Sequence, residues 1–222
     1  MTATGNSIVR SSLRDQVLAE LRQRLVSGRL EPGKIYSAQA VAAELGVSGS
    51  PVREAMLTLV NQDLMAPVRN RGFMVVEISE QNRVDILEMR LWLEVPAMAR
   101  LAAEPDRIHR HQRRLRDTAG GIVTSARTRD VVAFLDQDRE FHLALTGLLG
   151  NVVLTDMVGH LRDRTRLYGL DALSERGSLV SSAEEHLEIL DAIAAGSVAD
   201  AERLMTAHLQ HVLGDWAGHT GS

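Results

Sequence analysis

The stretch AELGVSGSPVREA, residues 43–55, decides the fold of the first third of the chain. It joins the end of one amphipathic segment to the start of another through a short turn that begins at Gly46. Gly46 favours a helix stop, whereas Ser50 is a good helix N-cap and Pro51 suits a first helical turn. Two helices joined by such a turn are typical of a helix-turn-helix, whose second helix lies in the major groove of DNA.

The sequence on either side completes a winged helix-turn-helix. Upstream, residues 11–27 carry Leu or Val at four-residue spacing, which predicts a further helix. Downstream, the helix after the turn is expected to reach about Leu64, and two short extended pieces follow near residues 65–68 and 73–78. The basic loop at residues 69–72 joins these two pieces, as in a hairpin wing. We therefore predict a winged helix-turn-helix domain over residues 1–78.

The rest of the chain has helical periodicity and no strand-like alternation, which predicts an all-α bundle of six to seven helices over residues 79–222 and a mainly α fold class. Glycine and proline separate the segments, with Gly120-Gly121 as one expected break. The expected helices lie at roughly 80–103, 105–118, 128–149, 151–172, 179–195 and 198–216.

Charge is distributed unevenly between the two parts. Residues 1–76 hold nine Lys/Arg against six Asp/Glu, and the remainder holds 16 against 23. A basic first third is expected when only that domain contacts DNA phosphates. The absence of cysteine excludes disulfides and thiol catalysis, and no apolar run is long enough to span a membrane. The polar residues 1–10 do not resemble a signal peptide, so we expect a cytoplasmic protein.

Four residues in the second part form a candidate metal site: Asp138, His142, His186 and His208. Asp138 and His142 lie four apart, so on a helix they share a face, while His186 and His208 lie on two later helical segments. Three imidazoles and one carboxylate suit Zn²⁺, Ni²⁺, Mn²⁺ or Fe²⁺. The alternative, polar histidines in an ordinary core, stays open from the residues alone. The remaining histidines are expected at the surface or outside the ligand set.

The predicted DNA-binding residues come from the turn, the third helix and the wing. Arg53 lies near the start of that helix, where its guanidinium can contact a guanine edge or a phosphate, although a solvated surface arginine is the plain alternative. Ser48 and Ser50 can donate to phosphates. In the wing, Gly72 permits a tight turn, and Arg69 and Arg71 are expected to contact DNA.

The chain resembles the GntR superfamily of bacterial transcription regulators, in the FadR branch with an FCD-type effector domain. The first half matches through LEPG at residues 30–33, the stretch at 43–55 and the wing residues 71–72. The second half matches through MRLWLE at 89–94, DREFH at 138–142, the Glu-His pair at 185–186 and AHL at 207–209. The resemblance covers essentially the whole chain. It implies a homodimer whose helical domains bind a small carboxylate metabolite beside a metal.

The resemblance also assigns a role to Arg90, as the clamp for the effector carboxylate. Its alternative is an ion pair with Glu94, one helical turn away. Two positions depart from the family pattern, because Gly49 and Gln39 stand where arginines are common. We therefore expect that the operator differs from the family's common one, or that Arg69, Arg71 and Arg10 take a larger part in DNA binding. The run at residues 161–166 is interpreted as a charged outer face with one inward residue, and Arg139, Arg162, Arg164 and Arg166 are weaker candidates for the pocket wall.

Together these features predict a dimeric DNA-binding regulator that binds a palindromic operator, with a repressor as the first interpretation. We expect it to respond to a small organic acid bound beside a divalent metal, with zinc as the first choice of ion. A metal-responsive sensor is one alternative. A metalloenzyme is another, but a hydrolase needs a general base beside the metal. Glu184 and Glu185 adjoin His186 in sequence and so do not share its helix face, which leaves neither in position to act as that base.

Overall fold

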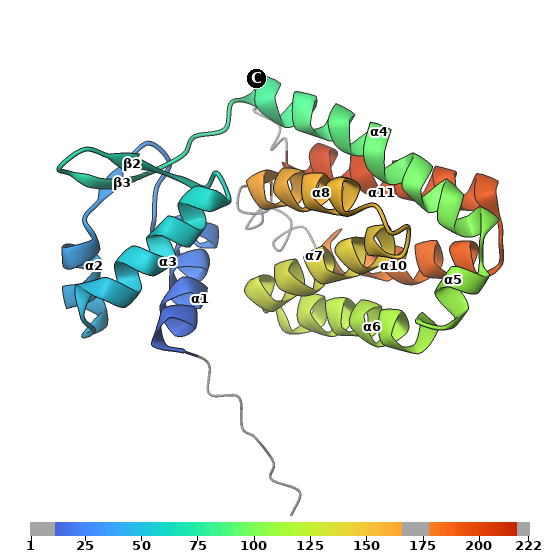
Figure 1. The fold of residues 1–222 in the computed structure, drawn as a ribbon, viewed down its shortest axis with the longest axis horizontal. Helices are drawn as coiled ribbons and strands as arrows, with labels where there is room; N and C mark the ends of the chain where they lie inside the picture. The colour runs from blue at the N-terminus through green and yellow to red at the C-terminus, as the bar shows by residue number, and fades with distance from the viewer. Residues whose placement is uncertain (1–11, 166–177, 217–222) are drawn as a thin grey trace, which may run out of the picture. The chain divides into compact units, whose positions relative to one another are not determined.

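The computed structural model describes residues 12–165 and 178–216, and the ribbon is drawn in Figure 1. Contacts divide the chain into two compact units, residues 1–76 and 77–222. Within residues 12–76 the first unit contains three helices and three short strands, and the second unit is helical in its described part. The mainly α fold class predicted from the sequence is confirmed.

The first unit is a winged helix-turn-helix in its described part. Its elements are α1 (Leu13–Val26), β1 (Ile35–Tyr36), α2 (Ala38–Leu45), α3 (Gly49–Asn61), β2 (Met65–Val68) and β3 (Gly72–Val75). Ser12 and Asp15 form a capping box that satisfies free N–H groups at the start of α1. Gly46 ends α2 in the left-handed conformation, as its position in the sequence predicts. The core between α1, α2 and α3 is aliphatic and includes Leu21, Val52 and Leu59.

The wing is a three-stranded antiparallel sheet in the order β1-β3-β2. Strand β1 was not predicted, because two residues give no usable alternation. Gly72, paired with Val68, begins β3 with φ of 129°. A Cβ at Gly72 would collide with the backbone carbonyl of Tyr36, so glycine is required both by the backbone conformation and by the approach of β1.

The second unit is a bundle of α-helices. Its described helices are α4 (Glu80–Ala103), α5 (Asp106–His109), α6 (Gln112–Thr128), α7 (Val131–Gly147), α8 (Val152–Thr165), α10 (Ser178–Ala194) and α11 (Val198–Trp216). Helix α4 packs along α11, while α6 packs against α7 and α10 (Figure 1). The end of the predicted helix at 151–172 lies outside the described residues. No described helix is long and apolar enough to cross a membrane.

Two predicted boundaries in this unit were wrong. The segment expected at 105–118 is split between α5 and α6, and α6 continues through Gly120-Gly121, where a break was expected. A Cβ at Gly121 would lie 3.1 Å from side-chain atoms of Gln137 on α7, closer than ordinary packing allows. Gly121 therefore permits close packing of two helices, and the helical hydrogen bonds on both sides outweigh the intrinsic helix-breaking tendency of glycine.

Candidate functional sites: a basic groove and a buried histidine–carboxylate centre

A basic groove lies between α3 and the wing. Arg53 reaches it from α3, and Arg69, Arg71 and Gly72 reach it from the loop and start of β3. The groove has a volume of about 410 Å³. Within the described residues no carboxylate pairs with the three arginines, which are all exposed. Its lining is Ser37, Ala38, Gln39, Arg53, Pro67, Val68, Arg69, Asn70, Arg71, Gly72 and Phe73.

The two serines predicted to contact phosphates lie at the start of α3 and do not line this groove. Ser48, not Ser50, is the N-cap, so the expected cap at Ser50 was wrong. The helix begins two residues early because Gly49 and Ser50 adopt helical conformation ahead of Pro51, which the first turn tolerates without an N–H. Ser48 makes no side-chain capping bond, and the Ser50 hydroxyl donates to Glu54 at 3.2 Å.

The four residues of the candidate metal site come together inside the helical unit. Asp138 and His142 are on α7, His186 is on α10 and His208 is on α11. One possible ligand atom from each lies within 4.8 Å of all the others. His186 Nε2 is 3.0 Å from Asp138 Oδ1 and 3.3 Å from His142 Nε2. The three imidazoles are almost completely buried.

Each imidazole meets a different oxygen through its other nitrogen. His208 Nδ1 lies 2.8 Å from Glu185 Oε2, and His142 Nδ1 lies 3.1 Å from Glu94 Oε2. His186 Nδ1 lies 3.1 Å from the carbonyls of Ser182 and Ala183 in its own helix. The oxygens at Nδ1 of His186 and His208 favour the tautomer that leaves the Nε2 lone pair available, which is the usual outer arrangement of metal-binding histidines. Glu94 lies close to His142 Nδ1, but among the described residues this nitrogen has no partner with hydrogen-bond geometry.

The electrostatics of the centre keep the imidazoles of His142 and His208 neutral and the carboxylate of Asp138 ionised. Burial lowers the pKa of His142 well below its ordinary value, and lowers that of His208 to about 4. Burial would raise the pKa of Asp138, but Arg162, His186 and His142 together lower it well below the ordinary 3.8. Neutral imidazoles and an ionised carboxylate are the protonation states that bind metal. The buried His208 Nε2 has no hydrogen-bond partner among the described residues, so the donor set fits a divalent ion.

A buried chain of alternating charges continues from the centre into α4. Arg162 Nη1 donates to Asp138 Oδ2 at 2.8 Å, and its Nη2 donates to Glu94 Oε2 at 2.6 Å. Arg90 Nε donates to Glu94 Oε1 at 2.8 Å. Both the guanidinium of Arg90 and that of Arg162 are at most 5% exposed. Arg90 therefore forms the ion pair with Glu94 that is the alternative to a role as effector clamp. This ion pair lies beside the histidine centre.

The roles of two residues in this region, Glu94 and Glu185, were not identified from the sequence. The helical spacing predicts Glu94 only as a partner for Arg90, and it places Glu185 on a different helix face from His186. Glu185 instead reaches His208 on α11, a contact between helices that spacing within one helix cannot show. The run at 161–166 was wrongly expected to have one inward residue, since both Arg162 and Asp163 are buried. The alternating basic and acidic residues of this run look like a solvent-exposed helix face, although these two side chains are buried.

The other candidates have less central positions. Arg139 forms a double hydrogen bond with Asp163, at 2.7 and 3.1 Å. His109, His111 and His160 are exposed, as expected of surface residues. The side chains of Arg10, Arg166, His211 and His219 lie outside the described residues.

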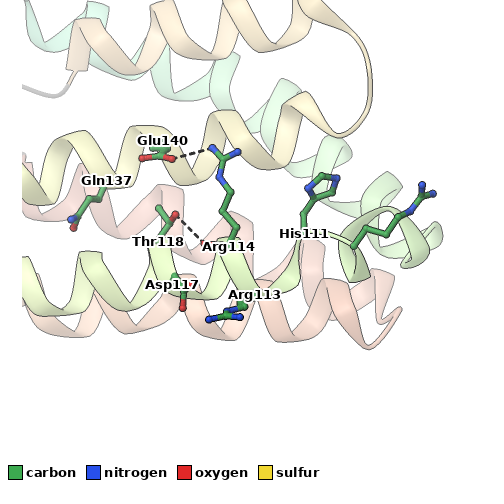
Figure 2. Close-up of a pocket in the computed structure, with 8 residues that line it drawn as sticks. His111, Arg113, Arg114, Asp117, Thr118, Gln137 and Glu140 are labelled. Carbon is green, nitrogen blue, oxygen red and sulfur yellow. Dashed lines mark hydrogen bonds and ion pairs between the residues drawn. The ribbon is translucent and has the colours of Figure 1, made fainter. Parts of the chain in front are cut away.

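A second hollow lies on the outer face of α6 and α7, with a volume of about 580 Å³. Figure 2 shows Arg114 directed to Glu140, while Arg113 and Asp117 lie on the other side of α6. The Arg114–Glu140 ion pair is 3.1 Å long and exposed. The charged groups of this hollow diverge, in contrast to the convergent nitrogens of the buried centre.

A winged helix-turn-helix with a basic groove, followed by a helical unit with a buried polar centre, defines the class of DNA-binding transcription regulators. Residues 13–75 match the model of the bacterial regulatory proteins of the gntR family, and residues 85–211 match that of the FCD domain. The chain belongs to the GntR family and carries an FCD domain. It is a transcription regulator, and its relatives are regulators rather than enzymes.

Relatives match over nearly the whole chain. An HTH-type transcriptional regulator from an unstable DNA locus of Streptomyces ambofaciens is 30% identical over 93% of this chain and 85% of its own length. A probable D-xylose utilization operon repressor of Paenarthrobacter nicotinovorans is 29% identical over 94% and 91%. The solved structure of E. coli McbR/YncC superposes with a TM-score of 0.68, at 26% identity, over 91% of this chain and 95% of that one.

Proposed function

We propose that this regulator is a repressor whose operator binding is controlled by a small organic acid, bound beside a divalent metal in the FCD domain. The observation that carries the proposal is the convergence of one atom each from three buried imidazoles and Asp138 within 4.8 Å of one another, with oxygen atoms 2.8–3.1 Å from each Nδ1. Several relatives are named as repressors, which supports that direction of control. The domain boundary near residue 78 and a cytoplasmic location belong to the same proposal.

The metal is held by Asp138, His142, His186 and His208. Zinc is the first ion to test, and the same ligand types also suit nickel, manganese and iron. When bound, the ion supplies a Lewis-acidic position for an anionic oxygen of the effector. The protein's part is to hold the imidazoles of His142 and His208 neutral, to keep Asp138 ionised through Arg162, and to exclude bulk water from the centre.

Arg90 is the proposed clamp for the effector carboxylate. Its side chain is 5% exposed, and in the described residues only its Nε has a hydrogen-bond partner, Glu94. A buried guanidinium with two unused terminal nitrogens is well suited to a carboxylate, because such pairing is bidentate and planar. Arg90 lies on α4, the first helix after residues 76–79 that follow the wing strand β3. The effector contact is thus made by the helix that leads directly to the DNA-binding unit in sequence.

DNA binding is assigned to the basic groove together with the start of α3. Arg53 is placed to contact base edges, and Arg69, Arg71, Ser48 and Ser50 to contact the DNA backbone. Gly72 shapes the wing. One short helix and one small wing form a limited interface, so we propose a homodimer that reads a palindromic operator.

Exposed apolar side chains support the dimer. Helices α4 and α8 pack against each other, and each bears a group of large apolar residues in solvent. Trp92 is 63% exposed, and Met89 lies one turn away on the same face of α4. Concentrated apolar exposure of this kind marks interaction surfaces. The proposed dimer surface consists of Val84, Met89, Trp92, Val152, Val153 and Met157.

The test is operator release by small acids in the presence of zinc. DNA from the region upstream of the protein's own gene is titrated with zinc-loaded protein, and hydroxy- and dicarboxylic acids are then added. The proposal predicts that at least one acid weakens DNA binding, that Arg90→Gln removes the response, and that Arg100→Gln, an exposed arginine on the same helix, preserves it. If zinc alone controls binding with no acid present, the protein is a metal sensor. If no acid changes DNA binding, the effector proposal is wrong.

A further inference from the structure

His208 has two nitrogens in contrasting environments. Its Nδ1 lies 2.8 Å from Glu185 Oε2, whereas its Nε2 is buried and has no hydrogen-bond partner in the part of the chain that the structure describes. The ring is packed on both sides, stacked with His142 at 5.3 Å between centroids and edge-on to His186 at 4.5 Å. The packing fixes the plane of the ring, and the contact with Glu185 determines which nitrogen carries the proton.

An ionised carboxylate only accepts hydrogen bonds, so Nδ1 must be the protonated nitrogen for this contact to be favourable. The unprotonated Nε2 is then the nitrogen of His208 that can bind a metal together with Asp138, His142 and His186. Glu185 comes from α10 and His208 from α11, so the contact also ties together two helices that each supply one imidazole.

We propose that Glu185 is a positioning residue of the metal centre, which selects the metal-binding tautomer of His208 without touching the ion. The inference rests on the proposed function, in that it concerns the same metal. The hydrogen bond withdraws Nδ1 from competition for the ion and increases the basicity of Nε2. Glu185 is 21% exposed while His208 is 1% exposed, so the carboxylate keeps access to solvent and still reaches a buried ring.

Glu185 is a side-chain acceptor for one imidazole, that of His208, so its substitution tests this contact. His186 is held by carbonyls of its own helix, which substitution of a side chain does not remove. Glu94, which faces His142, also holds two buried arginines, so its removal disturbs more than one contact. The adjacent Glu184 is an internal control, because it is 49% exposed and pairs with Arg127 outside the centre.

The experiment measures zinc affinity of the full-length protein by competition with a chelator, for the wild type, Glu185→Gln, Glu185→Ala and Glu184→Gln. We expect Glu185→Ala to lose affinity by about 10- to 100-fold, the usual effect of removing such an outer partner. Glu185→Gln is expected to lose less, because an amide oxygen still accepts a hydrogen bond. Glu184→Gln is expected to match the wild type.

A second readout uses the metal-free protein with ¹⁵N-labelled histidine. NMR is expected to show His208 protonated at Nδ1 in the wild type and in Glu184→Gln, and a shift toward the Nε2-protonated form in Glu185→Ala. A merely structural role for Glu185 does not predict that shift. Wild-type affinity and an unchanged tautomer in Glu185→Ala would overturn the inference. If the wild type binds no zinc, the metal proposal itself is wrong, and the tautomer still decides the role of Glu185.

Discussion

Arg162 joins Asp138 to Glu94 through one buried guanidinium, with its Nη1 on the first carboxylate and its Nη2 on the second. The contact links α8 to both α7 and α4, so a candidate metal ligand and the helix bearing the proposed effector clamp share one cation. Arg162 also contributes most to the lowering of the pKa of Asp138, against the opposing effect of burial. The two carboxylates depend on it for charge compensation.

Replacing Arg162 by methionine is therefore expected to destabilise the helical domain strongly. The substitution leaves Asp138 and Glu94 buried with less positive charge, and breaking a buried ion pair from one side costs about 3–5 kcal/mol. Urea unfolding of the metal-free protein measures the loss. Arg164→Met, two residues further along α8, is the control and is expected to change stability by less than about 1 kcal/mol. Equal stability of the Arg162 and Arg164 variants would contradict the account.

Acid is expected to destabilise the metal-free protein between about pH 6.5 and 4. Burial lowers the pKa of His208 to about 4, so as the pH falls the unfolded chain takes up the proton first. The stabilising contribution of neutral His208 is complete above the unfolded pKa and is lost as pH falls toward the folded one. For a shift of this size the loss is about 3 kcal/mol.

Urea unfolding at a series of pH values measures the slope of the free energy of unfolding against pH. His208→Asn is expected to flatten it, while His160→Asn, an exposed histidine, should leave it in place. His142, whose pKa is lowered in the same direction, maintains part of the slope in the His208 variant. A stability that does not change between pH 6.5 and 4 in the metal-free wild type would show that the imidazoles are not buried in neutral form.

In the DNA-binding unit, Arg53→Ala and Arg71→Ala are expected to act differently. Loss of a base contact at Arg53 should cost about 1–3 kcal/mol and relax base preference at one operator position. Loss of a DNA-backbone contact at Arg71 should weaken binding to all sequences. It should also reduce the slope of the logarithm of the binding constant against the logarithm of salt concentration by about one. Arg29→Ala, an exposed arginine that does not line the groove, is the control. Titrations at several salt concentrations distinguish these outcomes.

Trp92→Glu is expected to convert the proposed dimer to monomer. A charge at an apolar side chain that is buried only by a second copy carries a desolvation cost without a partner. Light scattering coupled to size exclusion gives the mass directly. Val198→Glu, at another exposed apolar position of the same domain, is expected to remain dimeric. A wild-type protein that is monomeric at all concentrations, or a Trp92→Glu variant that remains dimeric, would exclude this surface as the interface.

Much of the fold was predictable because local patterns dominate it. Helix α4 begins and ends where its periodicity and flanking residues predict, and Gly46 ends α2 as expected. Gly121 was misinterpreted because its role is set by Gln137 on a neighbouring helix. The same limit applies to the site. Asp138 and His142 share a turn and are recognisable together, whereas the contact between Glu185 and His208 arises only when α10 and α11 pack together.

Metal analysis of the purified full-length protein tests the central claim most directly. The measurement compares the wild type with Asp138→Ala, His186→Ala and the exposed control His160→Ala, each after dialysis against added ions and then against buffer. The account predicts about one equivalent of a divalent metal in the wild type and the control, and its loss in the other two variants. No bound metal in the wild type under any loading condition would contradict it, and the three buried histidines would then be polar residues of the core.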